Sequence, residues 1–377
     1  MLEVQSLAAC WELDEMEVAV HVLRQIDVAD SIDLTLLSDA LRELEPTRGA
    51  AVVRGLERPT GAGVVLRNEP LDLRMGQRTV GGFSCNVRLR VFDFGVVGVR
   101  FTFGASTPTA AALIELAARV AAESGEFDRE ARILWKELSV HAKDAVSPWE
   151  EAPSVPLIED YTVFVLPKAL DAEDADDALA HVLFEEPARR RLSRSLVKEV
   201  GRRAIRYYEE DLVIVDYDTA ILIDESGGAP LVDIFEIASS QLLEFRYYDA
   251  LLGRALGALA ADVRRARTAA SLIRSPYSRV SRRAASLALE VSELNDRLER
   301  AITLVGDTYT VQVYREASLR FRLAEAGNAV REKIGMIGRA ADVVGHEVQT
   351  RRDTALELLI VFLILLEIII AIKWPAH

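Results

Sequence analysis

Cysteine is scarce in this 377-residue sequence, and so are the residue patterns that carry chemistry. Its two cysteines, Cys10 and Cys85, are too few and too far apart for a disulfide framework, which fits a reducing compartment. Five histidines are scattered along the chain, and none is spaced with cysteines or acids like a metal site. A P-loop, a dinucleotide fingerprint and a nucleophile elbow are also absent. We therefore expect no catalytic residue, no metal and no cofactor, in a protein that is not an enzyme.

Positive charge is scarce as well, but only in the first two thirds of the chain. Residues 1–253 hold 26 Lys+Arg and 45 Asp+Glu, whereas residues 254–352 hold 18 Lys+Arg and 11 Asp+Glu. A basic segment beside a membrane is attracted to anionic head groups by about 1 kcal/mol per charge. The alternative is a solvated helical face whose arginine excess reflects GC-rich coding. We expect no nucleic-acid binding, because the acidic part of the chain would oppose it.

Long apolar runs are missing until residues 356–372, LELLIVFLILLEIIIAI. These 17 residues would measure about 26 Å as a helix, at the short end of what spans a bilayer. Arg351 and Arg352 precede the run, and Lys373 with Trp374 follows it as interfacial anchors. We expect a transmembrane helix with a lipid bilayer as its partner. The alternative is a helix buried in a protein core.

Two carboxylates interrupt this apolar run. Glu357 lies at its edge and can reach the head groups, whereas Glu367 lies beyond its midpoint. Either Glu367 is protonated or hydrogen-bonded across an oligomer interface, or it reaches the interface from a tilted helix. The N-terminal residues lack the features of a signal or transit peptide. We therefore expect a single-pass protein whose N-terminal bulk faces the cytoplasm, at a bacterial inner (cytoplasmic) membrane.

The first 229 residues mix strand and helix signals, which predicts an α+β fold. The clearest strand signal is the hairpin FSCNVRLRVFDFGVVGVRFTF, residues 83–103, in which apolar and polar residues alternate. Within it Asp93, Phe94 and Gly95 spell a kinase magnesium motif by coincidence, since no companion motif is present. Thr107 followed by Pro108 predicts the start of a helix. We expect an N-terminal α+β region over residues 1–150 and a second α+β unit over residues 151–229.

The remaining residues change to helical periodicity. We expect an antiparallel helical bundle or coiled-coil stalk over residues 230–355, followed by the transmembrane helix at 356–372. Its first apolar seam includes Leu242, Phe245 and Leu252 and is interrupted by Asp249. A later seam runs from Leu319 through Leu323, Val330 and Ile337 to Val344, and we expect that it could continue into the membrane helix. Packing within one chain and an intermolecular coiled coil both explain such seams, and the second predicts a homo-oligomer.

Four aspartates cluster between residues 211 and 224. They are Asp211, Asp216, Asp218 and Asp224. Clustered carboxylates can hold Mg²⁺ or Ca²⁺, but this spacing matches no calcium loop. Turn residues between strands are therefore the preferred interpretation.

The tail also resembles a known family. The segment LELLIVFLILLEIII, with Glu357 and Glu367, is similar to the C-terminal signature of the "required for meiotic nuclear division" family, membrane proteins of a domain of unknown function. VFDFGVV resembles the strand that opens the family's domain, and EIASSQLLEF, residues 236–245, resembles its long helix. The likeness would cover about residues 87–372. It implies a C-terminal membrane helix below a cytoplasm- or matrix-facing domain, and it implies no enzyme activity.

Two functions follow as hypotheses. The preferred one is a C-terminally anchored, non-enzymatic scaffold or tether with an acidic head facing the cytoplasm, which self-associates and binds an unidentified protein partner. The alternative is a metal-dependent hydrolase or nucleotide-processing enzyme that uses the acidic turns at 211–224.

Overall fold

The computed structural model describes most of the chain in ten ranges. They are residues 17–48, 52–54, 70–107, 109–147, 157–168, 170, 175–185, 191–225, 228–268 and 308–373. Within them, side chains are not described at residues 42–48, 52–54, 262–268, 341–353, 355, 367 and 369–373. The chain divides into two compact units: Met1–Tyr247 with Arg300–Glu325, and Tyr248–Glu299 with Ala326–His377.

The first unit is built on a mixed eight-stranded sheet in the order β3-β4-β5-β6-β1-β8-β10-β9. Its strands are β1 (Glu17–Asp27), β3 (Val52–Arg54), β4 (Leu71–Val80), β5 (Phe83–Val91), β6 (Val96–Ser106), β8 (Ile158–Leu166), β9 (Leu212–Val215) and β10 (Thr219–Ile223). Neighbouring strands are antiparallel, except that β10 runs parallel to β8. A separate pair joins β2 (Ser31–Ile32) to β7 (Val146–Ser147). The α+β prediction is confirmed.

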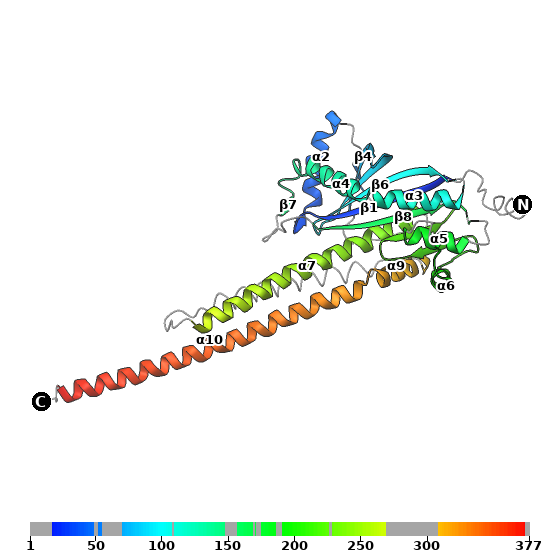
Figure 1. Cartoon of the computed structure of the whole chain (residues 1–377). Helices are drawn as coiled ribbons and strands as arrows, with labels where there is room; N and C mark the ends of the chain where they lie inside the picture. Colours follow the sequence, from blue (N-terminus) through cyan, green and yellow to red (C-terminus); the bar gives the residue numbers. More distant parts are fainter. Residues whose placement is uncertain are drawn as a thin grey trace, which may run out of the picture. The chain divides into compact units, whose positions relative to one another are not determined.

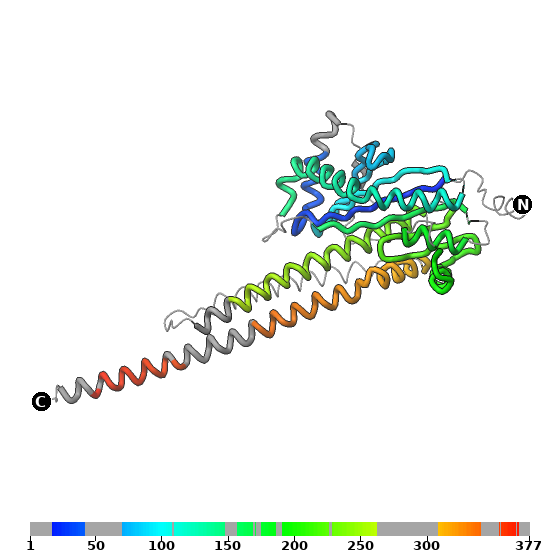
Figure 2. Tube along the Cα trace, in the orientation of Figure 1, coloured from blue at the N-terminus to red at the C-terminus, as the bar shows by residue number. Residues whose placement is uncertain are grey.

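One sheet takes strands from both predicted α+β regions. β1 pairs with β6 on one side and with β8 on the other, from Ala19 opposite Val165 to Ile26 opposite Ile158. Figure 2 shows the blue trace of β1 between the cyan β6 and the green β8. The expected boundary at residue 150 therefore runs through a single sheet, because β1 supplies hydrogen bonds to both sides.

The helices lie over both faces of the sheet in the first unit (Figure 1). In the described ranges the helices are α2 (Leu34–Arg48), α3 (Ala110–Ala122), α4 (Ser124–Ser139), α5 (Ala175–Leu183), α6 (Arg194–Arg202), α7 (Ala229–Thr268), α9 (Thr308–Arg320) and α10 (Leu323–Lys373). Against α3, α4 and α5 the sheet buries an apolar core that includes Val20, Val87, Phe101 and Phe127. Against the start of α7 it buries a mixed layer, in which Tyr161 of β8 stacks on Phe235 with ring centroids 5.3 Å apart.

The predicted hairpin is β5–β6. Its apolar residues, such as Phe83 and Phe101, face the α3–α4 core, so its polar residues lie on the α7 side. The expected N-cap at Thr107 is wrong: α3 begins two residues later, where the hydroxyl of Thr109 accepts a hydrogen bond from the Ala112 amide at 3.2 Å. Thr107 is itself buried.

The helical part of the chain contains two very long helices, α7 and α10. The seam expected from Leu319 to Val344 is broken, because Arg322 adopts a φ of 56° between α9 and α10 and Leu319 is exposed. After the break, Leu323, Val330 and Ile337 are buried at seven-residue intervals.

Candidate functional site

The α7-facing side of the sheet carries charge where a core would normally be apolar. Asp72 of β4, Arg90 of β5 and Arg100 of β6 are buried there, and Arg88 of β5 lies beside them. Strand alternation places them together, because apolar residues occupy the opposite side of the same strands. Cross-strand pairing sets Asp72 opposite Arg90, and Arg88 opposite Arg100.

Asp72 is held by both arginines of β5. Arg90 contacts it in bidentate fashion, with Nε 2.8 Å from Oδ1 and Nη2 3.0 Å from Oδ2. Arg88 Nη2 donates to the same Oδ2 at 2.5 Å. One carboxylate therefore serves two guanidinium groups, and the sheet side of the site is left with an excess of positive charge.

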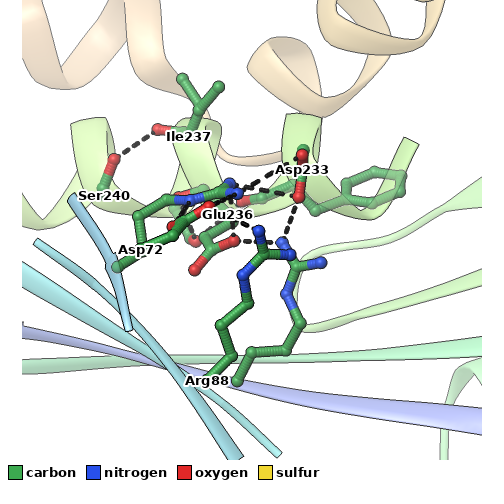
Figure 3. A network of polar contacts seen from close by, with 10 residues as sticks. Asp72, Arg88, Asp233, Glu236, Ile237 and Ser240 are labelled. Carbon is green, nitrogen blue, oxygen red and sulfur yellow. Dashed lines mark hydrogen bonds and ion pairs between the residues drawn. The ribbon is translucent and has the colours of Figure 1, made fainter. Parts of the chain in front are cut away.

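Helix α7 supplies the compensating carboxylates, Asp233 and Glu236, which lie one turn apart. Glu236 Oε2 accepts from Arg90 Nη1 at 3.0 Å, and Asp233 Oδ1 lies 3.1 Å from the same nitrogen. Arg100 Nη2 donates to both carboxylates. Figure 3 shows the carboxylates of α7 meeting the strand residues, with Ser240 bonded to the Ile237 carbonyl further along the helix. We call Asp72, Arg88, Arg90, Arg100, Asp233 and Glu236 the α7 clamp.

The clamp balances three positive against three negative charges. Burial alone would raise the pKa of Asp233, but Arg100 and Arg90 outweigh it and lower the pKa to about 2. For Arg90 and Arg100, burial alone would lower the pKa, but the nearby carboxylates outweigh it and raise the pKa. All three groups are therefore charged at neutral pH. Removing one partner of such a network is costly because the other charge stays buried.

A buried glutamine adjoins the clamp. Gln25 of β1 is fully buried, and within the described residues neither atom of its amide has a hydrogen-bond partner. A Cβ at Gly98 would lie 2.7 Å from Gln25 Oε1 and 2.8 Å from Glu236 Oε1. Gly98 is therefore what allows β6 to approach these two side chains. Nearby, burial and the charge of Arg100 lower the pKa of His21 to about 3, so this imidazole is neutral.

A second ion pair joins α7 to the sheet further along the helix. Glu159 of β8 is buried beside Gln25 and accepts from Arg246, which also contacts the Tyr217 hydroxyl. Burial raises the pKa of Glu159 to about 7, although Arg246 acts in the opposite direction. Helix α7 is thus held to the first unit by charged contacts at two separate positions.

These contacts are suited to holding a helix against the sheet. The clamp's carboxylates are already engaged by arginines, and no cysteine or serine nucleophile is among the six residues. The four predicted aspartates lie before, between and after β9 and β10, as expected of turn residues. Burial raises the pKa of Asp216 and of Asp218. In the part of the chain that the structure describes, no group of three His, Cys, Asp or Glu residues could hold a metal ion.

The predicted seam residues lie along α7. Leu242 and Leu252 are buried, and Phe245 is partly buried. Asp249 forms an ion pair with Lys333 of α10, with Nζ 2.6 Å from Oδ1, and the Asp249 carbonyl accepts from the same Nζ at 2.8 Å. The polar interruption of the seam is thus the place where the second unit joins its two helices by charge.

The predicted tail residues fall mostly outside the described side chains. This holds for Arg351, Arg352, Glu367 and Lys373, and the whole of Trp374 lies outside the described residues. The backbone of 323–373 is one helix, on which Glu357 is exposed. Among the residues described here, we find no helix with the length and hydropathy of a membrane span.

The clamp was not predicted from the sequence. A signal was available: Arg88, Arg90 and Arg100 occupy the polar positions of the hairpin pattern, and Asp233 and Glu236 share one face of the next long helix. Alternation alone places the three arginines in solvent. Only the position of α7 shows that they are covered.

The fold and the clamp define an α+β protein in which a mixed sheet is fastened to the long helix α7 by buried ion pairs. The chain belongs to the family described as "Uncharacterized protein MJ0711, N-terminal domain", whose model matches residues 17–229. It is 28% identical, over 180 residues, to the uncharacterized protein MJ0711 of Methanocaldococcus jannaschii. That match covers 47% of this chain and 53% of the relative, so the chain spans about half the length of the curated relative.

The family match corrects the resemblance suggested by the tail. The chain matches the MJ0711 family rather than the "required for meiotic nuclear division" family. Short apolar helices with two glutamates arise readily in unrelated chains, which explains why the tail misled. No solved structure matches this chain.

Proposed function

We propose that this protein is a C-terminally anchored, non-enzymatic scaffold or tether. The supporting observation is the surface of α10 between residues 356 and 368. Every described apolar side chain of this stretch is between 42% and 63% exposed, and these side chains lie on all sides of the helix. An apolar surface of this extent is stabilised by removal from water, into a bilayer or against other chains.

The bilayer is the better solvent for this surface. Fourteen Leu, Ile, Val or Phe residues in 356–372 contribute about −0.3 to −0.6 kcal/mol each, against about 2.5–3.5 kcal/mol for one internal acid. Arginine residues before the run and Lys373 after it supply charges for the head groups. The N-terminal bulk would then face the cytoplasm.

The clamp supports a tethering role. Because buried ion pairs fix the start of α7 to the sheet, the sheet domain is a preformed body that a partner could bind without ordering it first. The partner's identity and the self-association of the helical unit are part of the proposal.

Cell fractionation tests the anchor. The full chain should sediment with membranes from lysed cells and resist alkaline extraction. Leu359→Arg with Leu363→Arg should move it to the supernatant, because two charges at the centre of the span cost about 5–7 kcal/mol.

The control makes the same two leucine-to-arginine substitutions at exposed positions outside the apolar run. Leu36→Arg with Leu319→Arg alters two leucines that are 50% and 65% exposed elsewhere in the chain, and should leave the protein in the membrane fraction. Wild-type protein that stays in the supernatant would end the anchoring proposal.

A further inference from the structure

Two exposed aromatic side chains lie next to each other in the first unit. Tyr207 and Tyr208, between α6 and β9, are 56% and 64% exposed, and a third exposed tyrosine, Tyr217 in the β9–β10 turn, contacts Arg246 instead. In the described residues no other tyrosine is exposed to this degree. Exposed aromatic residues are more frequent in interaction surfaces than in the rest of a protein's surface.

The tyrosines are held in place by one another. The rings of Tyr207 and Tyr208 meet edge to face, with centroids 4.7 Å apart. Tyr207 also contacts Tyr309 of α9, with centroids 5.3 Å apart. Rings fixed in this way lose little entropy on binding, so they suit a preformed docking surface.

Negative charge surrounds the rings. Glu209 and Glu210 are exposed, and neither has an ion-pair partner within the described residues. Arg206 is the nearest cation in this turn; its Nη1 donates to the carbonyls of Glu209 and Asp211, both at 3.2 Å, so two exposed carboxylates face one guanidinium. Burial, with smaller contributions from the charges of Asp211 and Asp224, raises the pKa of Tyr309 to about 12. We call Tyr207, Tyr208, Tyr309, Glu209 and Glu210 the tyrosine patch.

Aromatic faces beside unpaired carboxylates match one ligand group especially well. A guanidinium stacks on an aromatic ring and donates in parallel to a carboxylate, whereas an ammonium does so less effectively. The patch therefore fits an arginine-rich segment. This chain contains one: residues 264–283 hold seven arginines and no carboxylate. The side chains of residues 264–268 are not described, and residues 269–283 lie outside the described residues.

We propose that the tyrosine patch binds the arginine-rich segment 264–283 of a second copy of this chain. The contact is heterologous, because it joins two different surfaces, and it would link copies in a row unless the rotation closes a ring. The proposal deepens the self-association in the proposed function and rests on it, but it does not require a membrane anchor.

Peptide binding tests the chemistry of the patch. The receptor is the full chain in detergent, with the segment's arginines changed to glutamine so that it cannot compete. These are Arg264, Arg265, Arg267, Arg274, Arg279, Arg282 and Arg283. A fluorescent peptide of residues 264–283 should bind saturably, as measured by anisotropy, and more weakly as salt is raised.

Matched variants separate the patch from general attraction. Tyr207→Ala with Tyr208→Ala should weaken peptide binding at least tenfold, whereas Ile133→Ala, an exposed apolar residue of α4, should leave it unchanged. A peptide with lysine at all seven positions should bind several-fold more weakly. Equal affinity for the double tyrosine variant, or for the lysine peptide, would overturn the proposal.

Photocross-linking decides whether the contact joins two chains. With Tyr208→p-benzoylphenylalanine in the otherwise native full chain in detergent, the product should have the mass of two chains and map to residues 264–283. A cross-link formed within one chain, or to another region, would contradict the proposal. Neither experiment depends on membrane insertion. A negative result in either one would therefore contradict the contact between copies without contradicting the proposed membrane anchor.

Discussion

At the scale of single residues, the molecule depends on charges placed where water does not reach. Arg90 and Glu236 are each about 1% exposed, yet each has partners on two elements. A buried ion network contributes little net stability compared with apolar packing, but losing one member is costly. We therefore expect the clamp to contribute specificity, because a shifted position of α7 would move both carboxylates away from the arginines.

We expect Glu236→Ala to lower the free energy of unfolding by about 3–5 kcal/mol, because Arg90 and Arg100 would lose their most buried shared partner. Urea unfolding of the full chain in detergent measures the change. Glu126→Ala removes an exposed pair with Arg129 on α4 and should cost less than about 1 kcal/mol. Equal losses in the two variants would mean that the clamp carries no special weight.

Glu159 predicts a pH dependence of stability. Its pKa rises from 4.5 to about 7 on folding, so the folded state holds the proton more tightly. The resulting stabilisation is complete below about pH 4.5 and is lost as the pH rises through 7; it amounts to about 3 kcal/mol.

The variant Glu159→Gln cannot titrate, so it should gain stability relative to wild type between pH 4.5 and 7. Denaturant titrations at pH 5 and pH 7 measure this gain. Glu126→Gln, at an exposed position of α4, serves as the control and should show none. Parallel pH profiles for wild type and Glu159→Gln would rule out the raised pKa.

At the scale of elements, local sequence patterns predicted the strands of the hairpin correctly but misplaced the start of one helix and missed a break between two others. The β5–β6 hairpin follows from two-residue alternation in the sequence, and its turn follows from Gly95. The N-cap was placed two residues early, because Thr107 and Thr109 are equally good capping residues and only the path of the chain after β6 separates them. The break at Arg322 was missed, since no glycine or proline marks it.

Gly95 gives the hairpin turn a specific test. Its φ is +88°, and a Cβ there would lie 1.8 Å from the Ala29 carbonyl oxygen. We expect Gly95→Ala to cost about 3 kcal/mol or more in unfolding free energy. Gly82→Ala is the matched control, because Gly82 also has a positive φ but meets nothing within 4 Å, and should cost about 1 kcal/mol. Similar losses would show that backbone strain alone matters.

The clamp shows why a site between elements escapes pattern reading. Alternation along each strand predicts on which side of the sheet its arginines lie, and helical periodicity predicts that Asp233 and Glu236 share one face of α7. Nothing local told which helix covers which part of the sheet, because that depends on pairings such as β1 with β8, more than a hundred residues apart. Long-range pairing is the part of the fold that a single sequence conceals.

At the scale of the whole molecule, the chain divides into a sheet unit and a helical unit, and the functions proposed above use different surfaces of the two units. The sequence predicted the change of character after residue 229, and α7 begins there. It did not predict that the first half of α7 belongs to the sheet unit, because a seam of apolar residues looks alike on either side of Tyr247.

Glu367 offers a test of self-association within the proposed anchor. If its carboxyl group bridges copies of the chain, Glu367→Gln should preserve membrane insertion but shift the distribution of oligomers in detergent, as measured by size-exclusion chromatography with light scattering. Glu357→Gln, at the edge of the same run, should change neither property. An unchanged distribution for Glu367→Gln would favour a side chain that reaches the membrane surface instead.

The family match ends at residue 229, and two of the clamp's three acids lie just beyond it, at Asp233 and Glu236. A fragment cut at the family boundary would expose three arginines, of which Arg88 and Arg90 keep Asp72 and Arg100 keeps no acid of the clamp. Such a fragment would lack the part of α7 that covers the arginines and the two acids that balance their charge, and we expect it to bind polyanions nonspecifically or to precipitate. Extending the fragment to residue 247 restores about five turns of α7, including both acids, and should cure both defects, which makes residue 247 a sounder place to cut than residue 229.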